Sequence, residues 1–464
     1  MFSQLFQTFA NCFKIPELRS RIIFTALVLG VCRLIAMTPI PGLDGVALSA
    51  FFESQSKNAG TNSVVGLYSL FTGGALEKCA VGSLGIMPYI SATIIIQLLS
   101  AVIPVLSKLS REEGGRAKII AYGRYLTVLL CLGQGLFMTL GWEHPEKAFS
   151  GFSGSLIPPD TNLWVYRIQT VAILTTATVL LMWLGEQITE RGVGNGVSLI
   201  ITIGILARLP LAGKSLQVMF FPTDPEMKAH AARWPTAILL IGSLAVVVAT
   251  VIAITQAQRK IPVQHAQRAV GRKVFSGGTS FMPLRVNYAG VMPVIFAQAI
   301  LMFPSLIFTK IGDMYNVKFL TSLGIMLSEH GWLYLILFGL MILFFSYFWV
   351  ATQFNELQVA DDLKKHGGYI PGVRPGVQTS DFLHRTMSRI TLAGAIFLVI
   401  IATIPTMLSK YVGIDYSVAQ FFGGTSMLIT VGVLLDTMRQ MESYLLMRHY
   451  DGFLKKGRVR GRMG

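Results

Sequence analysis

Ten separate stretches of this chain are apolar enough to cross a lipid bilayer. Most of them are also long enough, and the others are only slightly shorter. A spanning helix needs about 20 mostly apolar residues, because the hydrocarbon core is about 30 Å thick. Only 13% of the residues are charged and 53% are hydrophobic, which excludes a disordered chain and an ordinary soluble enzyme. The sequence therefore predicts an all-α polytopic membrane protein, with spans at residues 22–37, 81–104, 119–140, 163–184, 193–209, 235–255, 289–309, 331–351, 390–408 and 427–446.

Two of these spans carry helix-perturbing residues. The second contains Pro88, which lacks a backbone N–H, so we expect a helix there to bend or to begin late. The fifth span is short and begins among the glycines Gly192, Gly194 and Gly196. Such glycines superficially suggest a nucleotide-binding loop, but no strand precedes them. We interpret them as a tight turn that permits close helix packing.

The distribution of charge predicts the orientation. The chain has 39 Lys and Arg against 23 Asp and Glu, a net charge of +16. On a soluble domain this excess of basic residues would suggest binding to nucleic acid, but in a membrane protein it is typical of cytoplasmic loops. About two thirds of the basic residues lie on one side if residues 1–21 form a cytoplasmic amphipathic segment. We expect both termini in the cytoplasm, no cleaved signal peptide, and a basic tail at 447–464.

The spans divide into two groups of five. The polar segment 212–234 separates a first half, 22–211, from a second half, 235–446. Because five is odd, the second half must run through the membrane in the opposite sense to the first. The sequence thus predicts an inverted repeat, although the halves show no residue-level match.

The spans lack the groups that ion-coupled transport and catalysis need. Glu186, Glu190 and Asp436 lie at the ends of spans expected to face the cytoplasm, and no carboxylate lies at a span centre. Arg33 is the main charge within a span, where it can snorkel or pair. No phosphate-binding loop, zinc-binding helix motif or histidine spacing for a metal occurs. We expect no enzyme activity, no cofactor, no metal and, with four cysteines, no disulfide framework.

Two basic loops, 256–288 and 353–389, are candidates for docking. The second contains the turn-rich run 371–376 (PGVRPG), in which Pro and Gly hold Arg374 on a stiff turn. Such a cationic tip suits binding to an acidic partner or an RNA backbone. The simpler alternative is that the basic residues of these loops only determine the orientation of the spans in the membrane. On the opposite side, the short apolar run 64–71 could be a re-entrant segment, an interfacial helix or a packed loop.

Several motifs, read together, resemble the SecY/Sec61-alpha family of protein-conducting channels. They occur in family order over nearly the whole chain. They are 71–76 (FTGGAL), 84–98 (LGIMPYISATIIIQL), 182–192 (MWLGEQITERG), 194–196 (GNG), 283–287 (PLRVN), 289–293 (AGVMP), 371–376 (PGVRPG) and 422–426 (FGGTS). The resemblance implies an hourglass channel between two five-helix halves, closed by a short re-entrant plug helix at 64–74.

The resemblance also assigns roles to residues. An apolar ring at mid-membrane, which resists wetting when closed, would comprise Ile86, Ile90, Val197, Ile201, Ile295 and Ile429. The plug would include Leu67, Phe71, Gly73 and Gly74, and a lateral gate between the second and seventh spans would include Gln97 and Asn287. Docking of a motor ATPase or a ribosome would use Arg374, Arg268, Arg259 and Lys260. Gln267 departs from the family's usual Lys, which puts the contact beside Arg268 in doubt.

The implied function is passive conduction of unfolded secretory proteins, with lateral release of membrane segments into lipid. The implied partners are the small subunits SecE and SecG, the SecA ATPase, the ribosome, signal peptides and preproteins, membrane lipid, and YidC and SecDF. The implied location is the bacterial inner membrane. The main alternative is a ten-span, inverted-repeat solute transporter, and a second is a membrane enzyme such as an acyltransferase.

Overall fold

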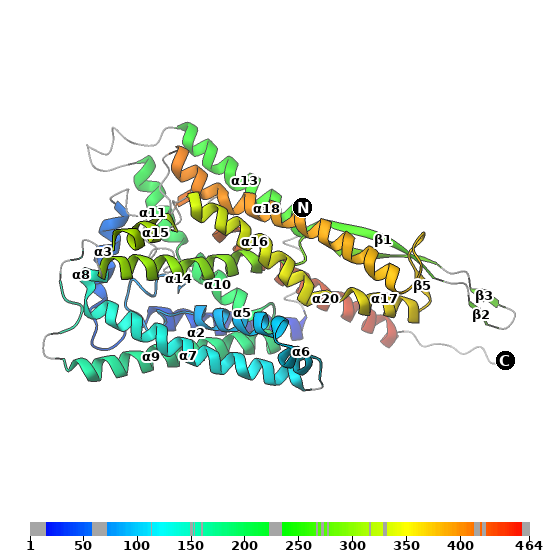
Figure 1. Cartoon of the computed structure of the whole chain (residues 1–464), viewed down its shortest axis with the longest axis horizontal. Helices are drawn as coiled ribbons and strands as arrows, with labels where there is room; N and C mark the ends of the chain where they lie inside the picture. Colours follow the sequence, from blue (N-terminus) through cyan, green and yellow to red (C-terminus); the bar gives the residue numbers. More distant parts are fainter. Residues whose placement is uncertain are drawn as a thin grey trace. The chain divides into compact units, whose positions relative to one another are not determined.

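The computed structural model is mostly helical and falls into two compact units (Figure 1). Unit 1 comprises Met1–Ser215 and Val433–Gly464, and unit 2 comprises Leu216–Gly432. The structure describes residues 15–57, 72–112, 114–148, 152, 154–158, 161–221, 234–265, 268–270, 273–275, 278–314, 317–327, 332–412, 418–419 and 424–456.

Unit 1 is built from helices. They are α2 (Pro16–Met37), α3 (Gly45–Lys57), α5 (Met87–Val102), α6 (Pro104–Arg111), α7 (Gly115–Glu143), α8 (Pro145–Ala148), α9 (Leu163–Arg191), α10 (Gly196–Leu206), the start of α11 (Leu209–Phe220) and most of α20 (Thr425–Lys456). Pro88 lies in the first turn of α5, where its missing N–H removes no hydrogen bond. The predicted late start of this helix is confirmed.

The helices α7 and α9 pack side by side along their length (Figure 1). Arg124 of α7 makes two hydrogen bonds to Glu186 of α9, at 3.1 and 2.7 Å. Arg167 of α9 makes two to Glu143 of α7, at 3.0 and 2.8 Å. Each helix advances 19 residues between the two pairs, from 124 to 143 and from 167 to 186. This equal spacing fixes the register of an antiparallel helix pair, with one ion pair near each end.

Unit 2 combines helices with short strands. Its helices are α13 (Trp234–Gln256), α14 (Met292–Met314), α15 (Lys318–Met326), α16 (Trp332–Gln353), α17 (Glu356–Lys365), α18 (Val377–Val412), the end of α11 and the start of α20. The helix α16 packs against α14 and α18 (Figure 1). At Gly339 of α16 an added Cβ would lie 3.3 Å from Val399 of α18, so a small residue here brings the two helices close.

A small antiparallel sheet lies in the two basic loops. Its strands are ordered β4 (Thr279–Arg285), β1 (Gln258–His265) and β5 (Gly368–Tyr369). A second hairpin pairs β2 (Arg268–Val270) with β3 (Lys273–Phe275). The sequence reasoning expected only loops here. Buried Ile261 and Val263 alternate with exposed neighbours, the period-2 pattern that favours a strand, but the run is too short and too basic to stand out.

Each of the ten predicted spans overlaps a helix. By length and composition, seven described helices could cross a membrane, and they are Pro16–Met37, Ala117–Glu143, Leu163–Arg191, Gly196–Lys214, Pro235–Gln256, Trp332–Lys365 and Val377–Leu408. Met87–Val102 and Met292–Leu301 are shorter apolar helices. The predicted class, a polytopic helical membrane protein, is confirmed. The inverted repeat and the division at 212–234 stay predictions, and α11 extends into the start of that segment.

Candidate functional site

The two basic loops form one folded body, which we call the docking lobe (residues 256–288 and 353–389). Backbone pairing joins them, because Gln264 and His265 of β1 are partners of Tyr369 and Gly368 of β5. Gly368 leaves space for this approach, since an added Cβ would lie 3.1 Å from the side chain of Val263. Segments about 100 residues apart in the chain are thus held in one unit.

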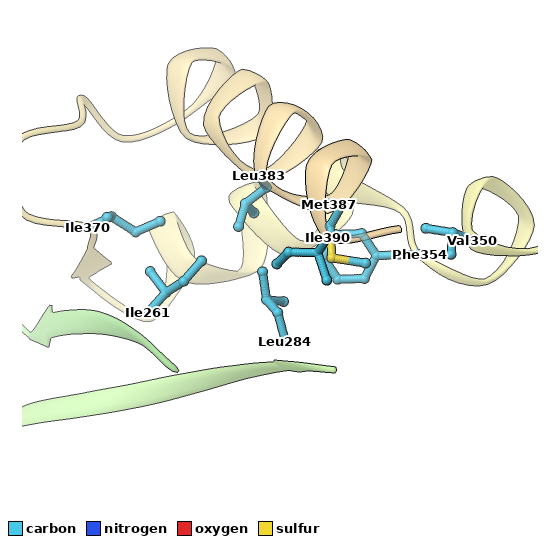
Figure 2. Close-up of a cluster of buried hydrophobic side chains, with 8 residues drawn as sticks. All are labelled: Ile261, Leu284, Val350, Phe354, Ile370, Leu383, Met387 and Ile390. Carbon is cyan, nitrogen blue, oxygen red and sulfur yellow. The ribbon is translucent and has the colours of Figure 1, made fainter. Parts of the chain in front are cut away.

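A buried apolar core stabilises the docking lobe. Figure 2 shows its eight side chains converging from β1, β4, the turn after β5, the end of α16 and the start of α18. They are Ile261, Leu284, Val350, Phe354, Ile370, Leu383, Met387 and Ile390. Leu383 is fully buried and Met387 nearly so. Full burial of such side chains contributes about 1.5–3 kcal/mol each, so the lobe has a core of its own and is no loose loop.

Arg374 lies at the exposed tip of a rigid turn in this lobe. Gly372 and Gly376 adopt φ values of +82° and +105°, which favour glycine, on either side of it. The backbone N–H of Val373 donates to the carbonyl of Ile370 at 3.0 Å. The carbonyl of Arg374 accepts from Oγ1 of Thr379 at 2.9 Å. Within the described part of the chain, no carboxylate forms an ion pair with Arg374, so its guanidinium faces solvent.

The other predicted docking residues lie on the same lobe. Arg259 and Lys260 are exposed on β1, next to Gln258 at the start of the strand. Arg268 lies on β2, where its backbone pairs with Phe275, and its side chain is outside the described residues. Loop 256–288 contains no Asp or Glu in its sequence. The field around β1 is therefore positive, and it favours an anionic partner.

Unit 1 brings together ring positions from α5 and α10. An added Cβ at Gly185 of α9 would lie 3.7 Å from Cδ1 of Ile86 and 3.7 Å from Cγ2 of Val197, so both side chains pack over this glycine. Ile90 and Ile201 each lie four residues further along, on the same helix face as the first two. Ile86, Ile90 and Ile201 are at most 3% exposed, and Val197 is half-buried.

Unit 2 places its two predicted ring positions at the same level along two neighbouring helices. The side chain of Gln298 in α14 donates to Oγ1 of Thr425 at the start of α20, at 3.0 Å. Seven residues further along α20, Gly432 abuts Val291 so closely that an added Cβ would lie 2.5 Å from it. The two helices are therefore antiparallel here. Ile295 of α14 and Ile429 of α20 each lie about midway between these two contacts, so they are at the same level along the helix pair. Each side chain is 1% exposed.

The two predicted gate residues belong to different units. Gln97 is half-buried in α5. Asn287 lies in the turn before α14 and not on a span, which corrects the expectation that it stands on a helix. Its Nδ2 donates to the carbonyl of Gly290 at 3.0 Å, and Gly290 has φ +63°. Asn287 thus shapes the entry into α14, while a gate contact with Gln97 stays a prediction.

The plug falls partly outside the described residues. Leu67, Phe71 and the rest of 58–71 lie there. Gly73 and Gly74 are described and buried, with φ values of +64° and +84°. They open a run of tight turns, residues 72–86, that leads into α5.

Sequence reasoning missed the contacts of this run. Among the described residues, the side chain of Arg33 in α2 donates from Nη1 to the carbonyl of Gly73 at 3.2 Å. Arg208, in the turn after α10, forms an ion pair with Glu77. The signal for Arg33 was visible, because it is a charge inside an apolar span. The pairing of Glu77 with Arg208 spans 131 residues, and no local pattern predicts it.

Together, the apolar helices and the exposed basic loops define a polytopic helical membrane protein. A family model described as SecY matches residues 80–438. The protein translocase subunit SecY of Chlamydia trachomatis is 41% identical, over 98% of this chain and 99% of that protein. The protein translocase subunit SecY of Thermotoga maritima is 39% identical, over 99% of this chain and 100% of that protein. The chain belongs to the SecY family.

Solved structures share the fold at lower identity. One is described as a protein conducting channel, with a TM-score of 0.58, 17% identity and coverage of 95% of this chain and 94% of that one. A second concerns a SecY plug domain that stabilises the closed channel and maintains a membrane seal, with a TM-score of 0.57, 17% identity and the same coverage. A third is Sec61 in a canine ribosome-channel complex, with a TM-score of 0.52, 16% identity and coverage of 95% and 94%. They establish the fold.

Proposed function

We propose that this chain is the channel-forming subunit of a protein translocase. It conducts unfolded secretory proteins across the bacterial inner membrane and releases apolar segments sideways into lipid, with both termini in the cytoplasm. The observation that carries the proposal is the set of ring positions. Five isoleucines and a valine, all uncharged and all but one almost fully buried, lie on helices that pack closely at small residues.

The chemistry of these side chains suits a seal around a moving polypeptide. β-branched side chains are stiff at χ1, so a ring of them keeps its shape. They offer neither donors nor acceptors, so they make no specific hydrogen bond to a passing backbone, and a narrow apolar constriction resists wetting. We infer that the ring closes around a translocating chain and excludes ions when it is empty.

The docking lobe is the proposed receiver of the driving machinery. A stiff turn holds Arg374 in solvent, and Arg259 and Lys260 add positive charge on the same lobe. This arrangement suits an acidic protein surface or an RNA backbone, which supports a motor ATPase (SecA) and the ribosome as alternating partners. A structural relative was solved within a ribosome complex. SecE and SecG are the proposed small subunits.

The charges in the described spans weigh against a solute transporter. Glu186 and Glu143 both lie near helix ends, and each is held by a bidentate arginine. Neither is a free carboxylate at the midplane of the kind that binds a coupling ion.

A reconstituted translocation assay tests the proposal. The chain would be placed in proteoliposomes with its two small subunits, then supplied with motor ATPase, ATP and a secretory precursor. We expect ATP-dependent protection of the precursor from external protease. Protection that is absent, although a known translocase reconstituted in parallel gives it, would contradict the proposal, as would saturable uptake of a small solute.

A further inference from the structure

The segment that precedes α5 is held at one end by a half-buried arginine. We call residues 72–80 the stem. Arg33 lies in the middle of the apolar helix α2, and its Nη1 donates to the carbonyl of Gly73 at 3.2 Å. Gly73 has no room for a side chain, because an added Cβ would lie 2.5 Å from Arg33 Nη1 and 2.9 Å from Cα of Gly204 in α10. The start of the stem is thus held between two helices.

A second contact holds the middle of the stem. Glu77 forms an ion pair with Arg208, and their side chains are only 18% and 14% exposed. Breaking a poorly solvated pair is more costly than breaking a surface pair, because water compensates the remaining charge less well. This pair therefore resists movement of the stem away from the end of α10.

The far end of the stem is bonded to the end of α2 through its backbone. Ala80 forms a β-bridge with Pro39. The N–H of Ile40 donates to the carbonyl of Cys79 at 2.9 Å, and the N–H of Val81 donates to that of Thr38 at 2.8 Å. These bonds do not depend on side-chain charge. The two arginines are therefore the parts of this attachment that a point mutation can remove without breaking the rest.

We propose that Arg33 and Arg208 are positioning residues that fix the stem against α2 and α10 and thereby stabilise the closed channel. The inference rests on the proposed channel function. Nothing in the chemistry of a passive channel requires an arginine within α2, and a charged side chain within a membrane span is costly unless it has a role. Arg33 donates to the carbonyl of Gly73 and Arg208 pairs with Glu77, so each arginine holds one part of the stem.

The test compares four variants of the complete channel complex in planar bilayers. Arg33→Gln loses the bond to the carbonyl of Gly73, and Arg208→Gln breaks the poorly solvated pair with Glu77. Each should raise the closed-state ion leak about tenfold or more. The charge exchange Glu77→Arg with Arg208→Glu should return the leak close to that of the unaltered channel. Arg124→Gln is the matched control, because it breaks an ion pair in the same unit that does not touch the stem.

A second readout follows the stem itself. Lys78 is exposed, so a nitroxide on Lys78→Cys, with Cys12→Ser to remove a competing thiol, reports stem motion without any transport. We expect a slow, ordered spectrum in the unaltered background, faster motion with Arg208→Gln, and no change with Arg124→Gln. An unchanged leak in a folded Arg33 or Arg208 variant, or an equal leak in the control, would overturn the proposal. Failure of the channel function itself would appear instead as no transport by the unaltered complex.

Discussion

Arg124 of α7 and Glu186 of α9 form a bidentate ion pair, and the same two helices carry a second pair, of reversed polarity, 19 residues away. At about 1.5 Å per residue this separation is about 28 Å, close to the thickness of the hydrocarbon core of a bilayer. Aromatic residues flank both pairs, with Tyr125 and Trp164 largely exposed, as in interfacial belts. This separation predicts that the two pairs lie at the two membrane interfaces.

A depth measurement checks this placement. Leu132 is exposed on α7, about midway between the pairs, whereas Tyr125 lies beside Arg124. A fluorescent probe on a cysteine at position 132 should be quenched most by lipids brominated deep in the acyl chain, and a probe at 125 most by headgroup quenchers. The same quenching profile at both positions would contradict the assignment of the interfaces.

The ring predicts that a polar substitution wets the closed channel. Ile90→Asn places an amide among buried apolar side chains, so the constriction no longer repels water. We expect the closed-state ion leak in planar bilayers to rise by an order of magnitude or more. The control is Ile95→Asn on the same helix, an exposed position that should leave the leak unchanged. Equal leaks in the two variants would remove Ile90 from the ring.

The docking lobe predicts a charge-specific defect. Arg374→Glu should abolish ATPase-driven translocation while leaving the folding of the complex and its closed-state leak as they are, because Arg374 is exposed and packs against no core residue. Arg385→Glu makes the same charge change on an exposed face of α18 in the same lobe and should retain most activity. Protease protection of a precursor measures both. Full activity of a folded Arg374→Glu complex would exclude Arg374 from docking.

The core of the lobe predicts a local effect on stability. Leu383→Ala removes a fully buried side chain and should destabilise the lobe by about 2–5 kcal/mol. Limited proteolysis should then cut within 256–288 or 353–389 far sooner than in the unaltered protein, while the spans stay protected. The exposed neighbour Arg385→Ala serves as the control. Equal cleavage rates for the two variants would mean that these side chains do not hold the lobe together.

The helices could be predicted from local pattern alone, because a span is defined by its own apolar length. Pro88 even located the start of α5. The docking lobe could not be predicted as one body, since the pairing of Gln264 with Tyr369 joins two loops whose separate sequences show only charge and turns.

The candidate site, like the fold, could be predicted from the sequence only in part. Ring positions came from the family resemblance, because an isoleucine in an apolar span has no local mark of function. The structure shows how four of these side chains are positioned, through Gly185 in unit 1 and the Gln298–Thr425 bond in unit 2, while their role in a ring stays a prediction. The contact of Arg33 with Gly73 depends on three-dimensional approach, so the sequence could flag the charge but not its partner.

The most direct test of the channel is to trap a chain in transit. A photoreactive residue would replace Ile90 or Ile295, one from each unit, and a secretory precursor would be stalled during translocation by a folded domain at its end. We expect strong, ATP-dependent crosslinks from both positions to the precursor, and none from the same probe at Leu129, which is exposed on α7. Crosslinks from Leu129 that equal those from Ile90 and Ile295, or none from the ring positions while translocation proceeds, would contradict a polypeptide path through the ring.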